Sequence, residues 1–394
     1  MGLDVASAVV FAVADSLEVV LQSWQAGSID ALINRLNDPE LWVGAAAGGA
    51  FGAALGALPA FVFTGFLVLA GALGGGDATG VGVGFGPVFG PHISFAGGAA
   101  AAAYAAKNGL IESGFDYHNG KDITFALGSR PDILAVGAAF GIFGILLEQT
   151  LRQLAVPTDP IAFTVVGSAV VHRIVFGYPV VGVVSEKANG FFDMGPFERE
   201  EMRPKGDLPF GDGDKEPTDM LAVEPWLPNM YNWSHVAGIG LVTGAAAGYA
   251  GLQIARAMAG EGVPLAEAPA IPAVFFGFGL SAASLLFLNL GVERIPVTHH
   301  MTLPGATAFF AVTQSSGTDA ILAGLDPVLG MVVAGAFGML GALVGEAVQR
   351  IFYAHSSTHL DPPAFSIFIT HSIMAVLALL GVMATAVWVP GAAF

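Results

Sequence analysis

Residues 326–349 read DPVLGMVVAGAFGMLGALVGEAVQ, and this stretch decides the fold class. After Asp326 it holds a single charged residue, Glu346, in an otherwise apolar run. A helix needs roughly 20 apolar residues to cross the roughly 30 Å hydrocarbon layer of a membrane, because each residue advances it by about 1.5 Å. The stretch therefore predicts a membrane-spanning helix.

The rest of the chain has the same character. Of its 394 residues 54% are hydrophobic and only 11% are charged, and the mean hydropathy is +0.70. Soluble domains carry about 25% charged residues. Helices satisfy their own backbone hydrogen bonds in lipid, whereas an open sheet does not, and the weak alternation of the sequence argues against a barrel. We therefore predict an all-α, polytopic membrane helical bundle in the cell membrane.

Parts of this stretch recur upstream. Ala336–Gly341 (AFGMLG) matches Ala139–Gly144 (AFGIFG), and a glutamate follows each, Glu346 and Glu148. Three further matches keep the same order, at offsets between 197 and 208 residues. They pair Gly44–Ala50 with Gly244–Ala250, Asp159–Phe163 with Asp361–Phe365, and His92-Ile-Ser94 with His300-Met-Thr302. These matches predict two tandem repeats.

Each repeat divides into about five apolar segments. In the first repeat they are 41–57, 59–75, 88–106, 132–152 and 159–182; in the second they are 235–258, 270–291, 299–314, 326–349 and 363–388. An odd number of spans gives the two repeats opposite orientations, as in the inverted repeats of many transporters. With this topology most Lys and Arg residues fall in loops on one side, which the positive-inside rule makes cytoplasmic.

The predicted organisation has four parts. They are an N-terminal helix (1–36), repeat 1 (37–185), a polar acidic connecting loop (186–231) and repeat 2 (232–394). The N-terminus lacks the basic region of a signal peptide, so we expect it to be retained. The aromatic residues of the loop indicate that it folds back onto the membrane surface, either as an ordered linker or as a small cap.

Charge and cysteine content exclude several functions. The formal net charge of -17 is a poor match for nucleic acid, so no nucleic-acid partner is expected. The acidic composition resembles that of proteins from salt-loving archaea. The chain has no cysteine, which excludes disulfides, thiolate metal sites and cysteine nucleophiles.

The third segment of each repeat is interrupted by proline and glycine. Such broken segments at matching places in two halves point to a binding site near the membrane midplane. The polar side chains there are His92 and Ser94 in repeat 1, and His299, His300 and Thr302 in repeat 2. We predict that they face a substrate or ion pathway. The alternative is that these histidines simply begin ordinary helices at the membrane interface.

Four other ionisable residues lie in or near spans. His172 and His371 occupy the fifth segments, where a histidine either faces a pathway or packs with a hydrogen-bond partner. Glu148 and Glu346 each precede an arginine by four residues, which favours a helix-end salt bridge. A gate or cation relay is the alternative role for these two carboxylates.

Three further features concern caps, metal and assembly. Asp159 and Asp361 precede prolines and are expected to cap helices. Asp361 with His355 and His359 forms a weak metal-site candidate, since imidazole and carboxylate are zinc ligands. Glycines at four-residue spacing, as in Gly44, Gly48 and Gly52, let helices approach closely, which favours tight packing or a homo-oligomer.

No catalytic motif is present in the sequence, so we expect neither an enzyme nor a cofactor. The leading hypothesis is a transporter or channel for a small polar solute or cation, with its path between the two repeats. The alternative is a non-transporting oligomeric scaffold of the membrane or envelope. A third class, a histidine-ligated haem or metal protein, is less favoured.

Overall fold

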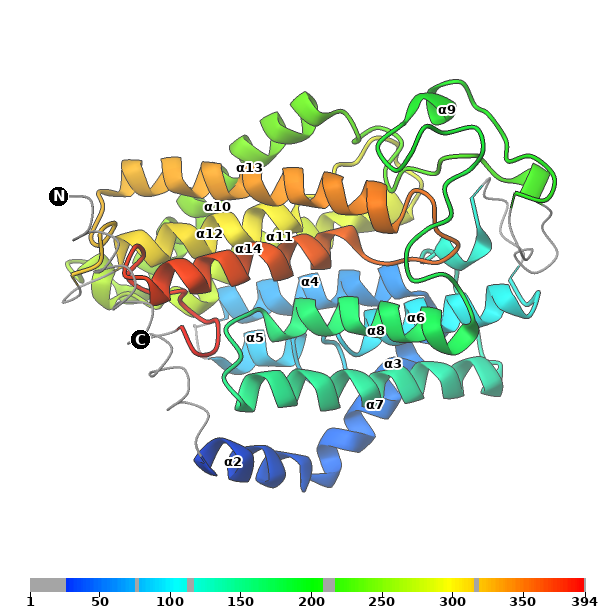
Figure 1. The fold of residues 1–394 in the computed structure, drawn as a ribbon. Coiled ribbons are helices and arrows are strands. Elements are labelled where there is room, and N and C mark those ends of the chain that lie inside the picture. The colour runs from blue at the N-terminus through cyan, green and yellow to red at the C-terminus, as the bar shows by residue number, and fades with distance from the viewer. Residues whose placement is uncertain (1–25, 75–77, 112–116, 208–216, 315–318, 393–394) are drawn as a thin grey trace, which may run out of the picture.

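The computed structural model describes residues 26–74, 78–111, 117–207, 217–314 and 319–392 (Figure 1). Within these residues the regular structure is helical, with thirteen α-helices and a single isolated bridge between Met202 and Leu221. The predicted all-α class is confirmed. Of the N-terminal helix predicted over 1–36, residues 1–25 lie outside the described residues.

The helices follow the predicted segments closely. In the first half they are α2 (Ala26–Leu36), α3 (Pro39–Leu55), α4 (Ala57–Leu73), α5 (Ala78–Gly84), α6 (Ser94–Lys107), α7 (Pro131–Gln153) and α8 (Pro160–Phe176). The short α9 (Gly195–Glu198) lies in the connecting segment. The second half holds α10 (Trp233–Ala259), α11 (Ala270–Asn289), α12 (His299–Thr313), α13 (Pro327–Phe352) and α14 (Pro362–Leu379).

An Asp-Pro pair starts four of these helices, α3, α8, α13 and α14. The aspartate side chain accepts a backbone N–H of the first turn, and the proline occupies a position whose N–H needs no partner. Asp159 accepts from Ile161 and Ala162, and Asp361 accepts from Ala364. The capping prediction for Asp159 and Asp361 is confirmed.

Glycine allows the central helices to touch through their backbones. In the first half Gly49 of α3 lies so close to the backbones of Gly137 and Gly141 that a Cβ would not fit, and Gly97 of α6 lies equally close to Gly49. In the second half Gly244 of α10 lies in the same way against Gly305 and Gly338. These small residues supply the close packing that lipid alone does not drive.

The glycines of the two matched segments have different neighbours. Gly44 lies against Pro87, whereas Gly244 lies against Ala334 and Gly338. Gly48 and Gly52 also pack inside the chain, against Val88 and Ser94.

The two halves meet through antiparallel pairs of helices. Thr158, just before α8, hydrogen-bonds Ser372 of α14 at 2.8 Å, whereas His172 near the end of α8 lies 3.2 Å from Thr358, just before α14. Helices α4 and α11 also run antiparallel, since Gly65 lies against Ala282 and Leu69 lies against Gly279. The same pairing of α8 with α14 is visible in Figure 1.

Helices α6 and α12 form the centre of the bundle. Every residue of α12 is buried, as are all residues of α6 except Tyr104 and Lys107. The carbonyl oxygen of His92 lies against Gly144, near the middle of α7, and that of His300 lies against Gly341, near the middle of α13. Both central helices therefore begin at half the depth of the long helices.

The outer surface is apolar. Five helices, α7, α10, α11, α13 and α14, are long and apolar enough to cross a membrane, and α4 and α8 are shorter apolar helices of 17 residues. Val242 of α10 and Val332 of α13 are 66% and 65% exposed, on the faces opposite the glycine contacts. Such a surface suits lipid better than water.

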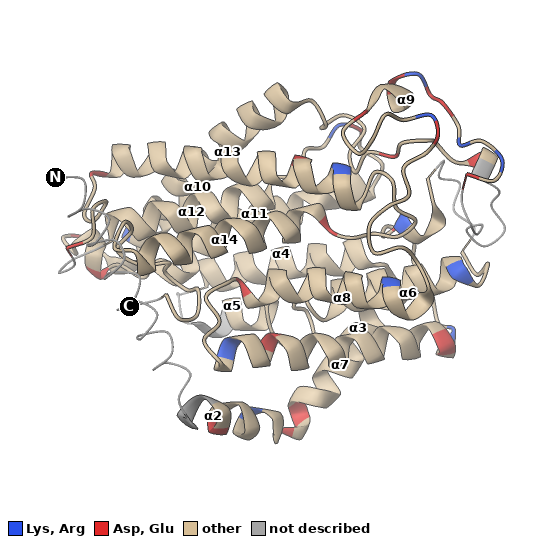
Figure 2. Ribbon diagram, viewed as in Figure 1, with Lys and Arg blue, Asp and Glu red and all other residues tan. Residues whose placement is uncertain are grey.

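Residues 178–207 and 217–232, which we call the cap, fold over one end of the bundle. Arg350 at the end of α13 donates to the carbonyl oxygens of Phe192 and Tyr231, each at 2.8 Å. Charged residues gather in the loops at this end (Figure 2). The described residues of this segment contact the bundle, whereas the prediction concerned the membrane surface and stays a prediction.

Three predicted boundaries are wrong. The segment predicted over 88–106 begins as a helix only at Ser94, because turns occupy residues 85–93. Helix α8 ends at Phe176 and not at residue 182, because Gly177 follows with a left-handed φ of 74°. Helix α14 ends at Leu379, whereas the prediction extended it to 388.

Candidate functional site

A cavity of about 490 Å³ lies between the two halves of the bundle. Its wall is mostly apolar and aromatic and takes residues from α4, α8, α11, α12 and α14 and from the cap. The aromatic residues on it are Phe61, Phe85, Phe95, Tyr117, Phe197, Trp226, Phe275, Phe278, Tyr353 and Trp388. A volume of this size is typical of small-molecule sites.

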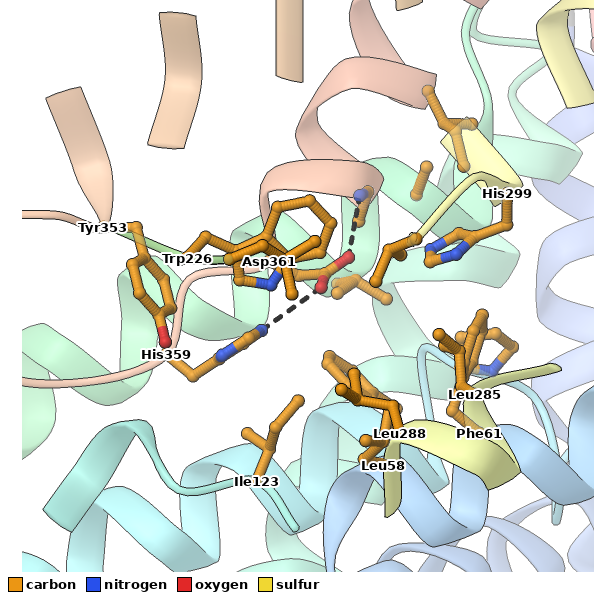
Figure 3. Close-up of a pocket in the computed structure, with 18 of the residues that line it drawn as sticks. Leu58, Phe61, Ile123, Trp226, Leu285, Leu288, His299, Tyr353, His359 and Asp361 are labelled. Atoms are coloured by element: carbon orange, nitrogen blue, oxygen red, sulfur yellow. Dashed lines mark hydrogen bonds and ion pairs between the residues drawn. The ribbon is translucent and has the colours of Figure 1, made fainter. Parts of the chain in front are cut away.

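Asp361 and His359 form a polar pair on this wall (Figure 3). The Nε2 atom of His359 lies 3.2 Å from Oδ1 of Asp361, while Oδ2 of Asp361 accepts the Ala364 N–H at 2.8 Å. The pair is positioned by the start of α14 and the loop before it. The backbone of that loop is fixed by Arg173, which donates to Thr358 Oγ1 at 2.9 Å and to the Thr358 carbonyl at 2.8 Å.

His299, the first residue of α12, also lines the cavity. Its ring lies between those of Phe61 and Phe278, with centroid distances of 4.9 and 5.8 Å. Its side chain is buried, and Nδ1 has no hydrogen-bond partner among the described residues. The Nδ1 atom of His359 is likewise buried without one.

Asp159 lines the same cavity from the start of α8. Since α8 and α14 run antiparallel, with Thr158 level with Ser372 and His172 level with Thr358, Asp159 and Asp361 lie near opposite ends of the cavity. Fourteen residues separate these two levels, and Asp159 and Asp361 lie one and three residues inside them. About ten residues, or about 15 Å, therefore separate the two aspartates along the helices. The cavity is therefore elongated along the helices and is not a shallow surface depression.

A buried ion network borders the cavity at the cap. Glu224 of the cap contacts His118 Nδ1 and Lys121 Nζ, each at 2.7 Å, and all three side chains are buried. Burial alone would raise the pKa of the Glu224 carboxyl, but the two basic partners lower it to about 2. Burial lowers the pKa of Lys121 to about 8 although Glu224 opposes this. Both groups are therefore charged at neutral pH.

A second cavity of about 360 Å³ adjoins the first. Leu227, Pro228 and Leu288 line both, so these residues form the wall between them. The second cavity carries the polar residues His235 and Arg294. Its position places a more polar chamber beside the largely apolar one.

Comparison with known proteins identifies a matching family. A model of a family of unknown function (DUF7973) matches residues 31–392. The chain belongs to this family. No curated protein and no solved structure matches the chain.

Of the histidines expected at the midplane, the structure places only His299 on the cavity wall. His92, Ser94, His300 and Thr302 are buried at the starts of α6 and α12 without lining it. The Ser94 hydroxyl lies 3.3 Å from the carbonyl oxygen of Phe89. The carbonyl oxygens of His92 and His300 lie at about half the depth of the long helices.

His172 and His371 make contacts typical of packed histidines. His172 Nε2 lies 3.2 Å from Thr358 Oγ1, and His371 bonds Thr307 and the carbonyl oxygen of Ile367 at 3.1 and 3.0 Å. Neither lines the cavity. Their partners support the packing alternative.

Glu148 and Glu346 form the helix-end salt bridges that their spacing favours. Arg152 Nε lies 2.6 Å from Glu148, and Arg350 Nε lies 2.5 Å from Glu346. Both carboxylates are buried and neither lines the cavity. The arrangement supports the salt-bridge account over a gate.

The weak metal candidate separates into two contacts. His359 pairs with Asp361, whereas His355 Nε2 lies 3.3 Å from the carbonyl oxygen of Phe191. Within the described part of the chain no group of three His, Asp or Glu side chains could hold a metal ion.

Sequence reasoning missed Glu224, Lys121 and His118, and it treated Asp159 only as a cap. Glu224 and Lys121 are about a hundred residues apart in loops, and nothing in one dimension pairs them. The signal for Asp159 was present, because Asp159-Pro and Asp361-Pro are matched by the repeat. An Asp-Pro pair at matching positions in both halves was the sequence feature that could have indicated a shared cavity.

Proposed function

We propose that the chain is a multi-pass transporter of the cell membrane for a small polar solute or cation, built from two inverted repeats of about five helices. Supporting the repeats, α3 packs on α6 and α7 as α10 packs on α12 and α13. The corresponding helices α4 and α11, and α8 and α14, meet antiparallel. This is the relation expected for inverted repeats. We assign it no catalytic role.

The observation that carries the proposal is a cavity lined by matching residues of both halves. Asp159, Ala162 and Val165 on α8 correspond, at one constant offset, to Asp361, Ala364 and Ile367 on α14, and all six line it. A site at the interface of two inverted repeats is the arrangement that alternating access requires, since rocking one half against the other exposes it to either side.

The dimensions suit a pathway. Asp159 and Asp361 are about 15 Å apart along the helices, about half of the roughly 30 Å apolar layer. Each carboxylate is then nearer to a different membrane face. Leu227, Pro228 and Leu288 separate the cavity from the second chamber, which favours a transporter with closed gates over an open channel.

The test is flux into liposomes that contain the purified protein. We would compare wild type with Leu303→Trp, which adds bulk to a residue on the cavity wall, over a panel of small inorganic cations, amines and neutral polar solutes. Flux of any solute above that of empty liposomes, lost in Leu303→Trp, supports transport. Equal flux in wild type, the variant and empty liposomes for the whole panel contradicts it and favours the scaffold alternative.

A further inference from the structure

The charges and the apolar wall of the central cavity point to one class of ligand. Three carboxylates line the wall, those of Asp122, Asp159 and Asp361. The described cation among the lining residues is Lys121, and its ammonium is already held by Glu224 at 2.7 Å. A bound anion would meet uncompensated negative charge, whereas a cation would gain from it.

The rest of the cavity wall indicates that the ligand has an apolar body. Phenylalanine, tryptophan and tyrosine side chains dominate it, together with leucine, isoleucine and valine. Aromatic faces attract cations as well as apolar groups, because their quadrupole places negative charge on the face. A small hydrated metal ion would leave most of this wall without a partner, but an organic cation with an apolar body would fill it.

The polar end of the cavity can accept hydrogen bonds from a ligand. Asp361 is buried and has a single side-chain partner, His359, beside its capping contact. His299 and His359 are at least nine-tenths buried, line the same cavity and each keep an unpartnered Nδ1. A bound ammonium or other cationic group supplies the positive counter-charge that the Asp361 carboxylate lacks.

We propose that the cavity binds an amphipathic organic cation, with Asp361 as counter-charge to its head and the aromatic wall around its body. This rests on the proposed function in naming the substrate class of the same site. It assigns the site a chemical selectivity by charge, so that an anion or neutral molecule of equal shape is rejected.

Two probes of equal shape and opposite charge test this, tetraphenylphosphonium and tetraphenylborate. Binding to the purified full-length protein in detergent is followed by equilibrium dialysis and by tryptophan fluorescence, since Trp226 and Trp388 line the cavity. We expect saturable binding of tetraphenylphosphonium and none of tetraphenylborate. Equal binding of the two probes overturns the proposal.

The variant is Asp361→Asn, and Asp326→Asn is its matched control. Asparagine caps helices as well as aspartate, so both variants keep their helix starts. Asp326 caps α13 through the Val328 N–H at 2.8 Å and does not line the cavity. We expect Asp361→Asn to weaken cation binding by at least about tenfold and Asp326→Asn to leave it unchanged. Unchanged binding in Asp361→Asn overturns the proposal.

The binding assay needs no transport. If wild type binds the cation but moves no solute in liposomes, the ligand class stands and the transport proposal fails. If wild type transports a solute of the panel and does not bind the phosphonium, the ligand class fails and transport stands. Ile367→Trp, which fills the cavity from α14, is expected to abolish binding irrespective of charge.

Discussion

The imidazole of His359 lies 3.2 Å from the carboxylate of Asp361, and both side chains border the cavity between the two halves. His359 is the side chain that orients this carboxylate, because the other contact of Asp361 is the backbone N–H of its own helix. We therefore expect His359→Ala to lower organic-cation affinity about fivefold, the effect of one hydrogen bond, and less than Asp361→Asn does.

Titration with tetraphenylphosphonium measures this effect. His355→Ala is the control, since His355 belongs to the same loop but contacts the cap and does not line the cavity. A loss of affinity in His355→Ala as large as that in His359→Ala would contradict a specific role of the Asp361–His359 pair.

Two glycines of α10 should respond oppositely to alanine. A Cβ on Gly244 would lie 2.5 Å from the Ala334 carbonyl oxygen, so Gly244→Ala forces α10 and α13 apart and destabilises the protein by about 1–3 kcal/mol. Gly238 has open space around it, and Gly238→Ala should be neutral or stabilise by up to about 1 kcal/mol. Thermal unfolding in detergent distinguishes them, and equal effects would contradict the backbone contact.

Arg173 joins the two halves from α8. Its buried guanidinium donates to Thr358, to the Phe352 carbonyl and to the Val180 carbonyl, at 2.7 to 2.9 Å. Arg173→Ala leaves these buried acceptors unpaired, and we expect a loss of about 3–5 kcal/mol in stability.

Arg199→Ala is the matched arginine control for that change. Arg199 pairs with Glu201 at 2.8 Å but is exposed, and exposed pairs contribute at most about 1 kcal/mol. Both variants are compared by thermal unfolding. A loss in Arg173→Ala no larger than that in Arg199→Ala would show that the loop before α14 is held by other contacts.

Acid should loosen the cap. Because the pKa of Glu224 is about 2 in the folded protein, below its ordinary value of 4.5, its ionisation stabilises the folded state above about pH 4.5. This contribution, about 3 kcal/mol, is lost as pH falls from about 5 towards 2.

Unfolding midpoints between pH 7 and 3 measure this loss. Glu224→Gln should be less stable than wild type at pH 7 and less sensitive to acid over that interval. Identical pH profiles for the variant and wild type would show that another group controls acid stability.

The absence of native cysteine allows the pathway to be mapped by single substitutions. Ile161 lies on the cavity wall near Asp159, and Ile123 lies on the wall in the loop layer beside Lys121. With inverted repeats and alternating access, an impermeant thiol reagent should reach Ile161→Cys from one side of sealed vesicles and Ile123→Cys from the other. Labelling of both from the same side would exclude a transmembrane pathway through this cavity.

The helices could be predicted from the sequence because lipid imposes a simple rule, a long apolar run for each span. Residues 270–291, for example, became α11 almost without change. Capping at Asp159 and Asp361 could also be predicted, since it depends on neighbours within three residues. These features are local, and local chemistry is what a sequence displays directly.

The site was less predictable because it depends on which side of a helix a residue occupies. His299 and His300 are adjacent, but only His299 lines the cavity while the ring of His300 meets Trp226 at 5.8 Å. The pairing of Glu224 with Lys121 joins two loops, and their separation in sequence gives no sign of it. The broken third segments predicted a site near the membrane midplane, and that depth stays a prediction.

The cap covers one end of the bundle only. The loop between α7 and Asp159 is five residues long, whereas the loop that precedes Asp361 is bound to Arg173 and to the cap. A bundle of two equal halves would open to both sides with the same ease. In the proposed transporter, opening on the side of Asp361 would break the bonds of Arg350 to the cap, so the closed state on that side is the more stable one.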